Sequence, residues 1–325
     1  MRLSVVIPTF DRKERLVRTL AALEAQRGDV ADGVEILVVD DGSTDGTRDV
    51  LAGLSREGRL KPLFSGHGGP ARARNAGARE AAGEILVFLG DDIVPEPGFL
   101  AAHVAAHREA PGEPRGVLGR TVWDSSRMRV TPMLRHLEER GLQFGYGLIQ
   151  DPENVPAWFF YASNVSVPRE TFLRLGGFDE AFGGAAWEDV EFALRAAAGR
   201  PPLRLVFRPS ARARHDHPTT VSSFRLRQQA SGMAAARLLA KRPDLASTLG
   251  ERDARSLAAA RPALLSAVES ILKALDPLGV PLPGRIYDKF FRWDYLDGLR
   301  KSLETGRGDG TVRVVGPADG LHPSV

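Results

Sequence analysis

Short apolar segments rich in β-branched residues alternate with segments of helical spacing along the first 92 residues, and this alternation leaves few folds open to the chain. The segment Leu3–Thr9 is almost entirely apolar, and a similar segment at Glu35–Gly42 ends in an acidic turn. Leucines at helical spacing between Arg12 and Gln26 predict a helix that connects the two strands. Continuous apolar runs of this length are typical of strands buried on both faces. We therefore expect an α/β fold, with a mostly parallel central sheet and helices on both faces.

The same order continues up to residue 92. A weaker strand is expected at Leu60–Phe64, a helix at Ala71–Ala82 and a strand at Glu84–Leu89. A helix that extends through Leu54 is expected to be capped by Ser43 or Thr44, because hydroxyl side chains accept hydrogen bonds from a first helical turn.

Paired acids follow two of the expected strands. Asp40 and Asp41 end the second strand, and Asp91 and Asp92 follow the strand at Glu84–Leu89. In a parallel sheet, ligands bind beyond the carboxyl ends of the strands. We therefore expect the two acidic pairs to lie near each other at a ligand-binding edge.

After Asp92 the pattern is less regular. We expect helices at Phe99–Glu109, Arg169–Leu175 and Glu188–Ala198, and strands at Gly116–Trp123, Trp158–Val167, Leu203–Phe207 and Ala211–His217; residues Val130–Gln150 give no assignment. Beyond Pro218, the chain has helical spacing with many Ala, Leu and Arg residues. Glycine and proline are frequent from Arg307 to Val325, which predicts a flexible tail.

Composition excludes several classes of protein. The chain contains no cysteine, which excludes a disulfide framework, a thiol nucleophile and cysteine-ligated metals. No apolar run approaches the ~20 residues that span a bilayer, and the first residues do not form a signal peptide. We therefore expect a cytoplasmic protein. The loop Gly66–Gly69 does not follow the first strand, so it is not a dinucleotide loop, and the chain has no phosphate-binding P-loop motif.

Positive charge is concentrated in one segment. Residues 201–242 contain nine Lys or Arg and a single acid, whereas the whole chain has a net charge of +3. Such a segment is suited to phosphates, to an anionic membrane or to solvent. No nucleic-acid-binding motif accompanies the charge, so we expect no nucleic-acid partner.

Four motifs occur in a characteristic order: Val39–Asp45, Ala73–Gly77, Phe88–Asp92, and Gly176–Asp179 leading to Trp187–Asp189. Together they resemble those of the family 2 glycosyltransferases, which have the GT-A fold, and the resemblance covers residues 1–217. It implies a catalytic domain at 1–217, with a nucleotide-binding half at 1–92 and an acceptor-binding half at 93–217. A C-terminal helical region at 218–306 and the tail at 307–325 would follow.

The resemblance implies a divalent cation, Mn²⁺ or Mg²⁺, at the second acidic pair. Asp92 is the first expected metal ligand, while Asp91 is expected to face the ribose or to support the ligand. Gly90 departs from the family pattern, which often has Asp at this position. A histidine after the last strand completes the metal site in related enzymes; His215 fits best and His217 is the alternative. Such an ion would stabilise the charge of a departing nucleoside diphosphate.

The remaining nucleotide contacts are also carried by the resemblance. Asp41 matches the acid that binds the nucleobase, and Asp40 would hold the turn. Arg74 matches a basic position near the diphosphate; a surface arginine is the alternative. Further contacts are expected at the rim after the first strand, from Pro8, Thr9 and Asp11.

The second half is expected to hold the general base and the acceptor. In family members the acid pair here supplies the base; Asp189 is the first choice and Glu188 the alternate. A carboxylate close to the acceptor hydroxyl can take its proton as the new bond forms. Trp187 is expected to raise the pKa of the base by lowering the local polarity. Acceptor contacts are expected from Trp158, Asn164 and Trp187, while core packing is the alternative for Trp158, Asn164 and Phe159.

These residues predict transfer of a sugar, by default from a UDP-sugar, to an acceptor hydroxyl with inversion. The acceptor would be a glycan, a lipid-linked molecule or a small molecule. Retaining transfer of the glucosyl-phosphoglycerate synthase type and a non-catalytic sugar-nucleotide or glycan-binding module are the alternatives. The expected helices at Ser223–Arg242 and Arg285–Leu303 suit peripheral contact with the inner face of a membrane, a homodimer, or packing on the chain itself.

Overall fold

The computed structural model describes residues 1–184, 186–257 and 262–305, so the expected tail at 307–325 lies outside the described residues. Its strands form one sheet in the order β3-β2-β1-β4-β7-β6-β8-β5. The strands are β1 (Leu3–Thr9), β2 (Val34–Asp40), β3 (Lys61–Phe64), β4 (Ile85–Leu89), β5 (Ile93–Pro95), β6 (Arg115–Trp123), β7 (Asn164–Pro168) and β8 (Arg204–His215).

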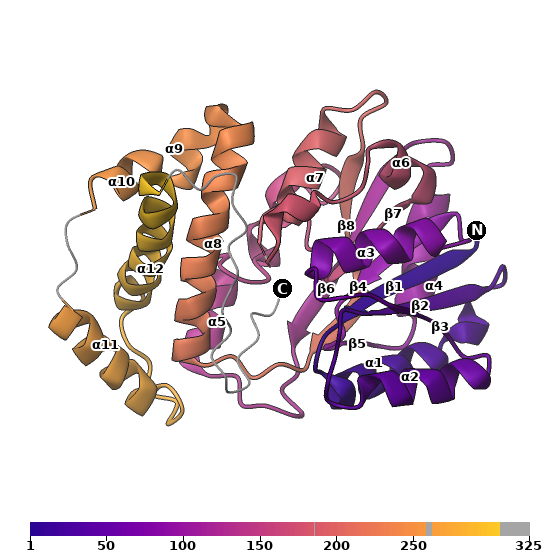
Figure 1. Cartoon of the computed structure of the whole chain (residues 1–325), viewed down its shortest axis with the longest axis horizontal. Coiled ribbons are helices and arrows are strands. Elements are labelled where there is room, and N and C mark those ends of the chain that lie inside the picture. The colour runs from indigo at the N-terminus through magenta and orange to yellow at the C-terminus, as the bar shows by residue number, and fades with distance from the viewer. Residues whose placement is uncertain (185, 258–261, 306–325) are drawn as a thin grey trace.

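Strand direction divides the sheet into two parts. Strands β3, β2, β1 and β4 run parallel to one another. Strand β7 is antiparallel to both β4 and β6, whereas β6 and β8 are parallel. Strand β1 begins at the labelled N-terminus, so the carboxyl ends of the parallel strands point toward the helices on the left (Figure 1).

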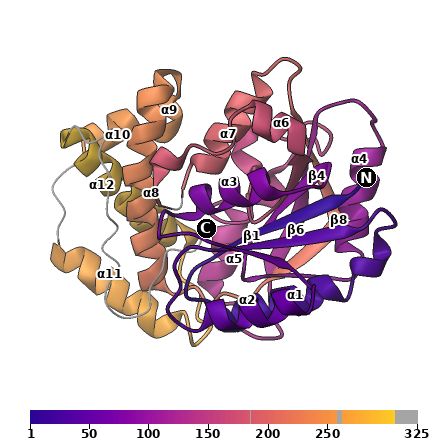
Figure 2. The same cartoon turned by 45° about the vertical axis from the view of Figure 1, so that its right-hand side comes forward.

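Helices cover both faces of the sheet, as expected. One core contains side chains of α1 (Lys13–Glu24), α2 (Thr47–Arg56) and α4 (Phe99–Arg108), and the other contains those of α3 (Pro70–Glu80), α6 (Arg169–Arg174) and α7 (Glu188–Ala197). Figure 2 shows α1 and α2 below the sheet and α3, α6 and α7 above it. Successive side chains of β1 enter different cores: Val5 and Ile7 join the first, and Val6 the second. Because both faces are buried, the strands read as continuous apolar runs.

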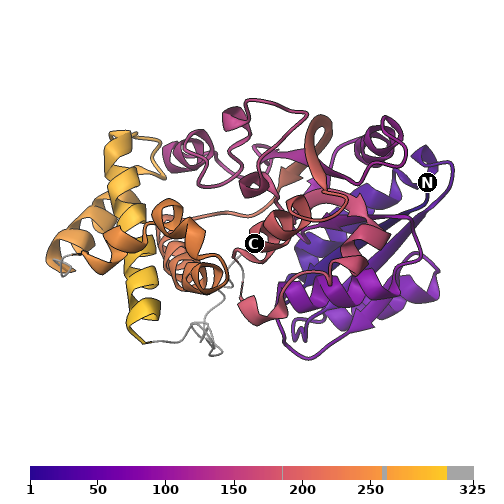
Figure 3. The same cartoon turned by 90° about the horizontal axis from the view of Figure 1, so that it is seen from above.

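The remaining helices gather at one end of the molecule, as the view from above shows (Figure 3). They are α8 (Val221–Lys241), α9 (Ala246–Leu249), α10 (Glu251–Arg255), α11 (Pro262–Leu275) and α12 (Gly284–Glu304), and α5 (Pro132–Glu139) lies near them. Single turns of 3₁₀ helix occur at Arg27–Asp29, Tyr146–Leu148, Ala157–Phe159, Glu180–Phe182 and Pro243–Leu245.

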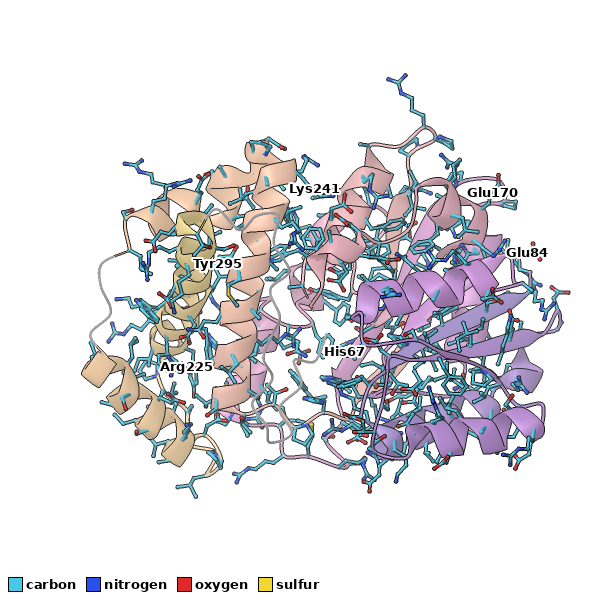
Figure 4. All side chains as sticks on the ribbon, viewed as in Figure 1. His67, Glu84, Glu170, Arg225, Lys241 and Tyr295 are labelled. Carbon is cyan, nitrogen blue, oxygen red and sulfur yellow. The ribbon has the colours of Figure 1, made fainter. Side chains whose placement is uncertain are left out.

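Helices α8 and α12 pack closely through two glycines. A β-carbon on Gly232 would lie 1.9 Å from the carbonyl oxygen of Tyr295, and one on Gly298 would lie 2.1 Å from that of Gln229. Arg225 of α8 also donates two hydrogen bonds of 2.9 Å to the buried carboxylate of Asp294 on α12 (Figure 4). Helix α8 therefore packs on the protein itself, which was one of the three alternatives.

Three local expectations need correction. Helix α2 begins at Thr47 after Gly46, whose φ of +88° suits glycine, so neither Ser43 nor Thr44 caps it. The two strands expected near the end of the sheet form one strand, β8, because β6 pairs along its whole length across a β-bulge. Strand β5 was not expected at all. No helix among the described residues is both long and apolar enough to cross a membrane.

Candidate active site

Thr9 joins the two acidic pairs at the carboxyl edge of the sheet. Strand β1 lies between β2 and β4, so its last residue is next to the ends of both neighbours. The hydroxyl of Thr9 donates to Asp91 Oδ2 at 2.8 Å, and its carbonyl oxygen accepts from the amide of Asp41 at 2.9 Å. The acidic pairs therefore share this edge, as the strand pattern predicts.

Strand β5 brings Asp92 to the end of β8. Ile93 pairs with His215, and the amide of Asp216 donates to the carbonyl oxygen of Asp92 at 2.8 Å. As a result, Asp92 Oδ2 lies 3.5 Å from His215 Nε2 and 3.4 Å from His217 Nδ1. Burial lowers the pKa of His217 to about 3, so its ring is neutral at pH 7. The two predicted metal-binding positions thus meet, although 123 residues separate them in the sequence.

The structure adds Arg12, which the sequence analysis did not single out. Its Nη1 lies 3.1 Å from Asp91 Oδ1 and 2.9 Å from Asp92 Oδ2. Burial would raise the pKa of Asp92, but His215, Arg12 and His217 outweigh it and hold that pKa far below its usual range. The sequence could have indicated an acidic partner for Arg12. This residue is the N-cap of α1, and a cation is unfavourable at a helix N-terminus unless an acid lies nearby.

Gly90 has no room for the acid that family members often carry there. A β-carbon at this position would lie 2.9 Å from Ile93 Cγ1 and 3.1 Å from Asp92 Oδ1. Asp92 therefore occupies the space beside the strand end that a carboxylate at position 90 would need.

The expected nucleotide contacts lie along the same edge. The carboxylate of Asp41 accepts from the backbone amides of Gly68 and Gly69, at 2.7 to 3.1 Å, and from Ser65 Oγ. Asp41 thus fixes the glycine-rich loop, on which His67 is labelled in Figure 4. Asp40 Oδ1 accepts from the amide of Ser43 at 2.9 Å and so holds the turn, as expected.

Asp11 belongs to this turn as well. Its Oδ1 accepts from the amide of Thr44 at 2.6 Å, and its φ of +49° places it in the left-handed region. Pro8 lies in β1 opposite Val39 of β2, one residue before Thr9. The expected contacts of Pro8, Thr9 and Asp11 with a nucleotide remain predictions.

Arg74 and Asn75 connect the first half of the sheet to the second. Arg74 is 1% exposed, which excludes the surface alternative, and its Nη1 lies 3.1 Å from Glu188 Oε1. The amide side chain of Asn75 donates to the carbonyl oxygen of Phe178 at 2.8 Å and accepts from its amide at 2.9 Å. The contact of Arg74 with Glu188 was not expected, and its role near a diphosphate remains a prediction.

The adjacent acids Glu188 and Asp189 differ in environment. Glu188 is 0% exposed, and burial, with a smaller contribution from Asp189, raises its pKa to about 7 despite Arg74. Asp189 is partly exposed, and its Oδ1 and Oδ2 accept from the amides of Val190 at 2.8 Å and Ala162 at 3.4 Å. Burial also raises the pKa of Asp189. Asp189 is therefore the more exposed acid of the pair.

The residues expected to contact the acceptor separate into two places. Trp158 and Trp187 are partly buried and pack edge to face, with ring centroids 6.5 Å apart. Asn164 is 0% exposed and interacts with His103, Thr121 and the carbonyl oxygen of Ala211. The acceptor role expected of Asn164 is wrong, because this polar core uses its amide. Phe159 packs against the apolar core of the sheet.

Comparisons of the sequence point to one family. The family model "Glycosyl transferase family 2" matches residues 4–165. A validoxylamine A glucosyltransferase of Streptomyces hygroscopicus subsp. jinggangensis is 36% identical over 251 residues, which cover 69% of this chain and 58% of that protein. The chain thus spans little more than half the length of this relative.

Solved structures share the fold. The mannosyltransferase PcManGT from Pyrobaculum calidifontis, in complex with GDP-Man and Mn²⁺, has a TM-score of 0.60 at 20% identity, covering 93% of this chain and 87% of that one. TarS of S. aureus, in complex with UDP, has a TM-score of 0.54 at 17% identity, covering 96% and 93%. At such identities the likeness shows the fold, which is GT-A with additional C-terminal helices.

Proposed function

Because the chain belongs to glycosyl transferase family 2, we propose that it transfers a sugar from a nucleoside-diphosphate sugar to a hydroxyl of an acceptor. A UDP-sugar is the proposed donor, and a glycan, a lipid-linked molecule or a small molecule is the proposed acceptor. The fold it shares with structures that hold UDP or GDP-Man supports a nucleotide sugar as donor.

Asp92 and His215 fit a divalent cation. Both ring nitrogens of buried His215 lack a hydrogen-bond partner among the described residues. A carboxylate oxygen suits Mn²⁺ and Mg²⁺ alike, whereas an imidazole nitrogen favours Mn²⁺ over the harder Mg²⁺, and phosphate oxygens commonly complete such sites. Within the described part of the chain, no group of three or more His, Asp or Glu is arranged to hold a metal. The donor would therefore supply the other ligands.

Arg12 would compete with a bound ion, because it contacts the same Asp92 oxygen as the two histidines. An ion held by Asp92 and His215 would neutralise charge on the departing diphosphate.

Asp189 is proposed as the general base of a single displacement. The acceptor oxygen attacks the anomeric carbon, its proton passes to the Asp189 carboxylate, and the bond to the diphosphate breaks with its electron pair leaving on that group. Glu188 is fully buried and ion-paired with Arg74, which supports Asp189 as the acid of this pair that acts on a substrate. One-step displacement inverts the anomeric configuration.

The observation that carries this proposal is the contrast between the two acids, together with the pairing of Asp92 and His215 at the same sheet edge. A thermal-shift screen of nucleotide sugars with Mn²⁺ or Mg²⁺ should identify the donor, since binding to the native state raises Tm. The anomeric configuration of the product, measured by NMR, then separates inversion from retention. Absence of stabilisation by every donor would contradict the proposal.

Two substitutions test the proposed roles. Asp189→Asn should lower kcat by at least about a hundredfold while leaving donor affinity nearly unchanged. The matched control is Glu191→Gln on the same helix, because Glu191 pairs with Arg195 instead. Asp92→Asn should abolish metal-dependent turnover. If Asp189→Asn weakens only donor binding, the base lies elsewhere.

A further inference from the structure

Helix α8, from the region after the resemblance ends, lies against the N-terminus of α7, the helix that carries the proposed base. The indole Nε1 of Trp187 donates to the carbonyl oxygen of Ser231 on α8 at 2.9 Å. Farther along the same helix, Lys241 forms an ion pair with Asp179 (Figure 4). Arg227 precedes Ser231 by four residues and so projects from the same side of the helix.

Arg227 differs from the other arginines around the site. Arg12 pairs with Asp91 and Asp92, and Arg74 pairs with Glu188. Arg227 instead donates to the neutral side chain of Gln143 at 3.0 Å, and no carboxylate of the described residues lies within 4.0 Å of its guanidinium.

The electrostatic surroundings of Arg227 are those of the site. Burial lowers the pKa of Arg227, the charges of Asp92, Asp189 and Glu188 partly oppose that effect, and the nearby cation Arg12 adds to it. Among these acids the strongest influence is that of Asp92, the proposed metal ligand. A partly buried cation that is surrounded by acids and, within the described part of the chain, is held only by an amide is suited to an anion that enters with the substrate.

We propose that Arg227 binds the second phosphate of the donor diphosphate, so that the C-terminal helices complete the donor site. This inference rests on the proposed function. The planar guanidinium can donate two parallel hydrogen bonds to phosphate oxygens, whereas the compact ammonium group of a lysine cannot. Gln143, which accepts from Arg227, is followed by Phe144, whose ring packs edge to face on that of His215 with centroids 5.1 Å apart. This position beside the proposed metal site favours the diphosphate over an anionic acceptor, which would lie on the side of Asp189.

The contribution of the second phosphate to binding is measured by comparing the affinities for a nucleoside diphosphate and for its monophosphate. Calorimetric titrations of wild type with UDP and UMP, and with GDP and GMP, in the presence of Mg²⁺ first identify the base that binds. Arg227→Gln should then weaken diphosphate binding by about tenfold or more and monophosphate binding by less than about twofold. Arg227→Lys should recover part of the difference.

Arg225→Gln is the matched control, because Arg225 lies on the same helix but faces Asp294 and Glu269. It should lower Tm without changing the ratio of the two affinities. An unchanged ratio in Arg227→Gln would overturn the inference, as would an equal change in Arg225→Gln, which would show that seating of the helix matters instead. Failure of wild type to bind either diphosphate would count against the proposed function itself.

Discussion

Replacing Glu188 with glutamine should flatten the pH dependence of stability between pH 5 and 8. In the native state Glu188 is fully buried and its pKa is about 7, whereas an unfolded glutamate has a pKa near its ordinary value of 4.5. Between these values the folded protein binds one more proton at this residue than the unfolded chain. The free energy of unfolding therefore falls as pH rises through this window.

The size of the effect follows from the two pKa values. Because the folded pKa is the higher one, the stabilising contribution is fully present below pH 4.5 and is lost as pH rises through 7. Proton linkage from these values gives a loss of about 2–3 kcal/mol between pH 5 and 8. Glutamine does not titrate, so Glu188→Gln should lack this contribution, while its amide oxygen can still accept from Arg74.

Urea unfolding at pH 5, 6, 7 and 8 measures the difference directly. The free energy of unfolding of wild type, relative to that of Glu188→Gln, should fall by about 2–3 kcal/mol across the series. Glu191→Gln, which alters an acid of the same helix that pairs with Arg195, is the control and should stay parallel to wild type. If Glu188→Gln is also parallel to wild type, Glu188 is ionised throughout and the argument from burial is refuted.

Two further substitutions test the packing and the charges. Gly298→Ala should lower stability by about 1–3 kcal/mol in a thermal melt, since its methyl group would meet a backbone oxygen of α8, whereas Gly53→Ala has nothing within 4 Å and should not; equal effects of the two would contradict the close approach. Arg12→Met should cost about 3–5 kcal/mol without metal, because Asp91 and Asp92 lose their shared cation. Mn²⁺ should then raise Tm more than in wild type, and a smaller rise would argue against competition for Asp92.

The parallel half of the fold could be predicted from the sequence because its signals are local. Strands β1, β2 and β4 are mostly apolar runs, and the polar or turn residues that follow each run mark where the strand ends. Strand β5 could not be predicted, because three residues that include Pro95 form a strand only through pairing with β8. Because β5 was not predicted, the sequence also did not indicate that its pairing with β8 brings Asp92 next to His215.

Site residues could be predicted where they lie at the end of a strand, because that position alone determines which residues surround them. Thr9, Asp91 and Asp92 are such residues. Long-range ion pairs were not predictable, because no local pattern reports that Arg74 will lie against Glu188, 114 residues away. Asn164 failed for the same reason, since its burial depends on α4 and β8 packing over the strand that carries it.

The contacts of helix α3 limit how segments of this chain can be exchanged with those of a related protein. Two consecutive side chains of α3 hold segments of the second half of the sheet domain. Arg74 contacts Glu188 at the start of α7, and Asn75 forms hydrogen bonds with the backbone of Phe178. A chimera that takes residues 1–92 from one parent and the rest from another inherits a working junction only when both parents keep these two contacts. We therefore expect the proposed donor-binding and acceptor-binding parts to be exchanged together rather than as separate modules.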